Sequence, residues 1–118
     1  MTLQVPRVSR EDVLRIVRRE FPPDERRAAL ELLDEYGSDY GCRERVQLAI
    51  LKLSRGDIEQ VRRYVRVAQV DFRDVIAPAE YPRFWEVGFV GVEEMSAAEV
   101  RRLKRDDSRQ YQAWLAGG

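Results

Sequence analysis

Hydrophobic residues recur at helical spacing through most of the chain. Ser9 and Asp12 form a Ser-x-x-Asp capping box, which satisfies free amides at the start of a helix. The apolar positions that follow predict a helix to about Glu20. A Pro-Pro pair then ends this helix, and its second member, Pro23, suits the first turn of another helix. We expect that second helix to stop at Gly37.

The middle of the chain predicts a buried central helix over residues 43–54. Its apolar residues leave little polar face, so we expect neighbours on nearly every side. Gly56 stops it and Asp57 caps the next helix. Apolar residues at 3-4-3-4 spacing in that next helix predict a packed seam, which consists of Ile58, Val61, Val65, Ala68 and Phe72.

The stretch after this seam predicts a short, interrupted helix. Asp71 begins an Asp-Phe-Arg-Asp cap, and Val75 and Ile76 follow in helical positions. We expect Pro78 to kink or end the helix, because a proline disfavours helical geometry in the residue before it, here Ala77.

Residues 81–95 form the least regular segment, which mixes aromatic side chains with glycine and proline. An extended segment over 87–92 is one interpretation, although two glycines weaken a strand there. Ser96 and Glu99 form a second capping box and predict a last helix to about Ala116. The pattern as a whole predicts an all-α fold, a single helical domain over 1–118. This domain is a bundle of five or six helices with an irregular, aromatic-rich segment before the last helix.

Composition excludes several classes of protein. Charged residues make up 36% of the 118 residues, above the usual value of about 25%. The 21 basic and 21 acidic residues cancel, so no net charge attracts nucleic acid or a membrane surface. The chain contains neither the apolar run of a signal peptide nor one long enough to span a bilayer. We therefore expect a cytoplasmic protein that does not bind membranes.

Missing residue types limit the chemistry. The sequence has no histidine, which removes the commonest general base and the commonest metal ligand. Its one cysteine, Cys42, excludes an intrachain disulfide and fits a reducing compartment. The chain has no phosphate-binding Gly-rich loop followed by lysine. We therefore expect no catalytic residues, no cofactor and no bound metal.

Two segments, RVQLAILKLSRGD at 45–57 and DFRDVIAPAEYP at 71–82, resemble small uncharacterised helical proteins of bacteria. The terminal segment QYQAWL at 110–115 resembles them more loosely. The resemblance covers about the middle third of the chain and departs from the pattern at Pro78. It implies a bacterial source and a helical fold, and it implies no activity or site.

Aromatic residues gather within nine positions of the irregular segment, and we interpret them as a partner-binding surface. Trp and Tyr dominate the energetics of protein interfaces, so Trp85 would be the anchor. The alternative is that the segment folds back and plugs the open end of the bundle. The predicted contact residues are Tyr81, Arg83, Phe84, Trp85 and Phe89.

Two other residue groups suggest other functions. Asp71, Asp74 and Glu80 could act as an acid/base pair or hold a divalent metal, or simply cap a helix and pair with Arg73. Basic residues on three predicted helices could contact phosphates or be ordinary solvated surface. The pair Asp106–Asp107 favours solvated surface. The basic residues are Arg15, Arg18, Arg19, Arg62, Arg63, Arg66, Arg101, Arg102, Lys104 and Arg105.

The sequence therefore favours a non-enzymatic protein that acts through protein–protein interaction. Homodimerisation is plausible, because several predicted helices are apolar on more than one side and a chain of 118 residues cannot bury them all. Nucleic-acid binding through the Arg-bearing helices is the first alternative. A carboxylate or metal-dependent enzyme is the second.

Overall fold

The computed structural model describes residues 6–37 and 42–117, with the side chain of Phe89 excepted. Within these ranges the fold is all-helical, as predicted, and contains no strand. Seven helices are described, so the prediction of five or six is wrong. They are α1 (Arg10–Glu20), α2 (Pro23–Asp34), α3 (Arg43–Ser54), α4 (Ile58–Val70), α5 (Arg73–Glu80), α6 (Pro82–Glu93) and α7 (Ala97–Ala116).

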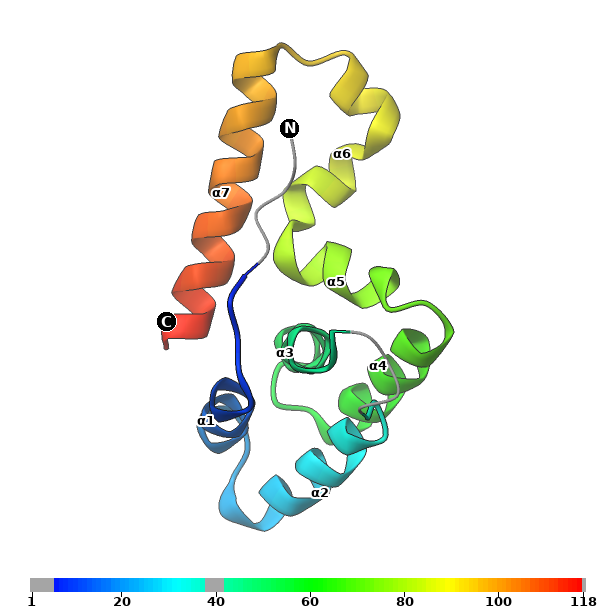
Figure 1. Ribbon diagram of the computed structural model, residues 1–118, viewed down its shortest axis with the longest axis vertical. Helices are drawn as coiled ribbons and strands as arrows, with labels where there is room; N and C mark the ends of the chain where they lie inside the picture. Colours follow the sequence, from blue (N-terminus) through cyan, green and yellow to red (C-terminus); the bar gives the residue numbers. More distant parts are fainter. Residues whose placement is uncertain (1–5, 38–41, 118) are drawn as a thin grey trace.

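Helix α3 lies at the centre of the bundle, as its apolar sequence predicts (Figure 1). It contacts α1, α4 and α5, and residues 46–51 are all buried. One of these residues is polar: the Gln47 side-chain amide donates to the carbonyl oxygens of Leu33 and Tyr36, at 2.8 and 3.1 Å. Gln47 thereby satisfies carbonyl groups near the end of α2, which a helix leaves unpaired.

The predicted helix starts are confirmed by their capping contacts. The Ser9 amide donates to the Asp12 carboxylate at 2.9 Å in a complete capping box. The Ser96 hydroxyl oxygen accepts the Glu99 amide at 3.1 Å. Asp57 accepts the amides of the second and third residues of α4. These caps depend on neighbours in the sequence, which is why the pattern alone predicted them.

Two details of the predicted second and fourth helices are wrong. Helix α2 ends at Asp34, before the predicted stop at Gly37. Helix α4 ends at Val70, so Phe72 lies outside the seam and is exposed, whereas Val61, Val65 and Ala68 are buried as expected.

Helix α5 passes through Pro78 without ending, which contradicts the predicted break. The proline removes one helical hydrogen bond, the one that its amide would donate to Asp74. Asp74 lies in the exposed first turn, where water can satisfy its carbonyl group. The helix instead ends at Glu80, because the φ of −137° and ψ of 63° at the following Tyr81 leave the helical region.

Most of this segment, residues 82–93, is helical, so neither the irregular segment nor the extended segment over 87–92 is confirmed. Pro82 occupies the first turn of α6, where its lack of an amide costs nothing. Gly88 interrupts the helix with φ 71° and ψ 174°, a conformation that is essentially confined to glycine. Two short helical pieces therefore replace the predicted irregular segment.

The described helices form one elongated globule with principal extents of 48 × 29 × 22 Å. Figure 1 shows why the molecule is long: α6 and the first half of α7 extend beyond the body that surrounds α3. We call these two segments, residues 82–93 and 97–106, the arm. The end of α7 returns to the body, where Arg19 of α1 donates to the Trp114 carbonyl oxygen at 2.7 Å. None of the described helices is long and apolar enough to cross a membrane.

Candidate interaction surface

The start of α6 is anchored to α7 by a buried carboxylate. Asp107 is 1% exposed, and its two oxygens accept the backbone amides of Arg83 and Phe84, each at 3.0 Å. These are the second and third residues of α6, whose amides have no partner inside the helix. Asp107 therefore acts as an N-terminal cap supplied by another helix, and it fixes where the arm leaves the body.

Arg83 strengthens the same junction. Its Nη1 atom donates to Oδ2 of Asp106 at 3.0 Å, so its guanidinium is turned toward α7. The pair Asp106–Asp107 thus positions α6, a role that the sequence analysis missed. No local pattern signals it, because the contacts of Asp107 span 23 and 24 residues.

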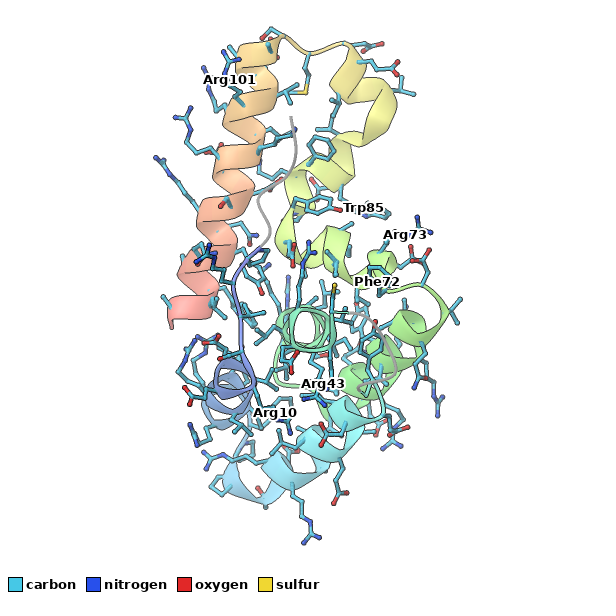
Figure 2. The ribbon with its side chains drawn as sticks, in the orientation of Figure 1. Arg10, Arg43, Phe72, Arg73, Trp85 and Arg101 are labelled. Carbon is cyan, nitrogen blue, oxygen red and sulfur yellow. The ribbon has the colours of Figure 1, made fainter. Side chains whose placement is uncertain are left out.

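The predicted aromatic cluster is divided between two environments. The rings of Tyr81 and Phe84 meet edge to face with centroids 5.9 Å apart, and the Nζ atom of Lys104 lies 5.7 Å from the centroid of Phe84. Tyr81 packs against the hydrophobic core, and this partial burial raises the pKa of its phenol. Trp85 lies on the other side of α6, away from α7 (Figure 2). The side chain of Phe89 lies outside the described part of the structure.

Helix α6 exposes large apolar side chains. Trp85 is 53% exposed and Val90 is 74% exposed, and Val87 is exposed as well. We call these three residues the α6 apolar surface. No residue of α6 whose side chain is described is buried. Large apolar side chains exposed together on one helix are typical of a site that another molecule covers.

The acidic residues predicted as a catalytic or metal-binding group serve separate structural contacts. Asp71 accepts from the Arg73 amide and guanidinium, at 2.9 to 3.0 Å. Glu80 is buried and receives two hydrogen bonds of 2.7 Å from Arg45, which raise the pKa of that guanidinium. Across residues 6–37 and 42–117, no three acidic or cysteine side chains come together in a way that could hold a metal.

The basic residues predicted as a phosphate-binding face are distributed over different sides of the molecule. Figure 1 shows α4 and α7 on opposite sides of α3 and α5. Several of these arginines are engaged in local pairs: Arg15 with Asp12, Arg62 with Glu59 and Arg19 with Glu20. The arginines of α1, α4 and α7 therefore do not form one continuous surface.

No protein-family model, curated protein or solved structure shows a significant match to the chain. The resemblance to small bacterial proteins, the bacterial source and the cytoplasmic location stay predictions from the sequence. Arguments about function therefore rest on the side chains that the structure places at the surface.

Proposed function

We propose that the protein is a non-enzymatic binding protein and that its partner is a second copy of the same chain. The observation that carries the proposal is the α6 apolar surface, Trp85, Val87 and Val90, on a helix with no buried residue among those described. A helix of this composition gains free energy when its apolar side chains leave water.

Symmetry favours a second copy as the partner. In a two-fold dimer each residue i that contacts j is matched by j contacting i. An antiparallel arrangement of two α6 segments about the Gly88 break would bring Trp85 of each copy toward Val90 of the other. Such a pairing would let the apolar side chains of the two copies cover each other.

The overall charge of the chain is compatible with self-association. Its formal net charge is zero at pH 7, so two copies do not repel each other as whole molecules. Full burial of an apolar side chain contributes about 1.5–3 kcal/mol, while association costs at least about 4 kcal/mol in lost freedom of motion. With three partly exposed residues from each copy, we expect a weak and concentration-dependent dimer.

Sedimentation equilibrium over a concentration series tests the proposal with two matched variants. Val90→Glu places a charge in the α6 apolar surface and should abolish the dimer. Val70→Glu makes the same change at a residue that is 88% exposed at the end of α4, and it should leave the dimer unchanged. A monomeric wild-type chain, or an equal loss in both variants, contradicts the proposal.

Trp85→Ala provides a second variant that separates binding from folding. Because Trp85 is about half exposed, we expect the variant to keep its fold, measured by circular dichroism and thermal unfolding, and to associate more weakly. Unfolding of this variant would mean that Trp85 belongs to the core, and the proposal would fail.

Nucleic-acid binding through α7 is the alternative that one observation favours. Arg101 and Arg102 are exposed, and neither forms an ion pair with a carboxylate in the described part of the chain. Retention on heparin that falls steeply with salt would support this alternative over self-association. The zero net charge predicts weak retention.

A further inference from the structure

A groove lies beside the end of α3, and its lining does not include the α6 apolar surface. Lys52 and Arg55 line two adjoining hollows there, of about 640 and 430 Å³. The larger hollow is also lined by Tyr64 of α4 and by Pro78 and Pro82 at the junction of α5 with α6. Its volume lies in the range of small-molecule sites. We call the two hollows together the Lys52 groove.

Lys52 places a partly buried amine in this groove. Its side chain forms no ion pair or hydrogen bond with any residue in the described ranges. The two acidic lining residues serve other contacts: Asp57 caps α4, and Glu20 accepts a hydrogen bond from the Trp114 indole at 3.3 Å. The ammonium of Lys52 has therefore lost water on burial without gaining a close partner, which disfavours its charged form.

The charges around Lys52 act in the same direction. Burial first, and then repulsion from the neighbouring Arg55 guanidinium, lower the pKa of Lys52 below its usual 10.5. The Asp107 carboxylate on α7 attracts the ammonium and opposes part of this effect. A lower pKa leaves more of the amine uncharged at neutral pH, and a lysine activated by desolvation and a neighbouring cation forms Schiff bases with carbonyl compounds.

We propose that the Lys52 groove binds a small 2-oxo acid and that the Lys52 amine forms a reversible imine with its carbonyl carbon. The nitrogen lone pair adds to that carbon, the two amine protons pass to the carbonyl oxygen, and this oxygen leaves as water while a C=N bond replaces the C=O bond. The Arg55 guanidinium binds the carboxylate of the ligand, since guanidinium groups hold carboxylates in a two-pronged geometry. The step is reversible binding without turnover, and it is independent of dimer formation.

Reductive trapping tests the proposal by comparing Lys52 with Lys104, the only other lysine of the chain. The protein is incubated with pyruvate and cyanoborohydride, which reduces the imine to a stable secondary amine, and peptide mass spectrometry locates the modified lysine. We expect Lys52 to react several-fold faster than Lys104 at pH 7 and its rate to saturate with pyruvate concentration. Equal rates at the two lysines overturn the proposal.

A neutral ketone tests whether Arg55 selects the carboxylate. The ratio of Lys52 to Lys104 modification corrects for the different reactivities of pyruvate and acetone, and it should be higher for pyruvate. Arg55→Gln should lower both ratios, because it removes the repulsion that activates Lys52, and should bring the two ratios together. Arg62→Gln is the matched control, because Arg62 pairs with Glu59 outside the groove and should change neither ratio. Equal ratios in the wild type, or a difference that persists in Arg55→Gln, overturn the proposal.

Discussion

Buried polar side chains join helices that are distant in the sequence. Asp107 connects α7 to the start of α6, Glu80 of α5 binds Arg45 of α3, and Gln47 connects α3 to the end of α2. Each of these groups has its hydrogen bonds satisfied, which removes most of the cost of burial. They determine how the helices are oriented relative to one another, which apolar packing alone leaves less specific.

Asp107→Ala should destabilise the protein, because it leaves two amides of α6 without an acceptor. We expect a loss of about 1–3 kcal/mol in the free energy of unfolding and faster hydrogen exchange at residues 83 and 84. Asp106→Ala is the matched control: it removes a largely exposed ion pair with Arg83 and should cost about 0–1 kcal/mol. Equal losses in urea unfolding would contradict the capping role of Asp107.

The pKa of Asp71 should depend on Arg73. Hydrogen bonds from the Arg73 side chain, and then from its backbone amide, lower the pKa of this carboxyl group below its usual 3.8. A group whose pKa is lower in the folded state stabilises the fold above its unfolded pKa, and this contribution is lost as the pH falls through the folded value. Arg73→Gln should therefore raise the pKa of Asp71 toward 3.8, measured by NMR titration; an unchanged value would contradict the pair.

Sequence reasoning at the level of residues identified the caps and missed the long-range contacts. Ser9, Ser96 and Asp57 were predictable because their partners lie two or three residues away. Asp107 was read as part of a solvated surface, because its partners lie in another helix and its charge suggested exposure. Which of two adjacent acidic residues is buried depends on packing, which no local pattern records.

At the level of elements, two glycines determine where the chain turns. Gly56 has a φ of 77°, and a Cβ atom there would lie 2.9 Å from the carbonyl oxygen of Glu20. The turn between α3 and α4 can therefore approach the end of α1 only without a side chain. Gly88 has a φ of 71°, but a Cβ atom there would meet nothing within 4 Å.

Alanine at these two glycines should have different effects. Gly56→Ala combines an unfavourable backbone conformation, worth about 1–2 kcal/mol, with the close contact to Glu20, and it should lower the stability of the whole protein. Gly88→Ala carries the conformational cost alone and should alter hydrogen exchange only in α6. Urea unfolding and amide exchange of both variants test this difference, and an equal loss of global stability would contradict it.

Helical periodicity predicted the elements well where one face is buried. The prediction for residues 81–95 is wrong because α6 buries no described side chain, so its sequence shows no helical stripe. Its glycines and Pro82 suggested an irregular segment instead. The predicted break at Pro78 is wrong because burial outweighs the effect of the proline. The helix loses one hydrogen bond there but keeps the burial of Val75, Ile76 and Ala79.

At the scale of the whole molecule, the body and the arm differ in how they are stabilised. The body surrounds the buried residues of α3, whereas the arm depends on the Asp107 cap, the Arg83–Asp106 pair and the contacts of Phe84. The arm extends the molecule along its longest axis (Figure 1). This division leaves the α6 apolar surface available to a second copy.

Intermolecular NOEs in a mixture of isotope-labelled and unlabelled chains test the central claim most directly. The account predicts contacts between the Trp85 ring of one copy and the Val90 methyl groups of the other, which strengthen with protein concentration and disappear in Val90→Glu. A dimer whose intermolecular NOEs arise only from other helices, or a chain that gives none at millimolar concentration, would contradict the account.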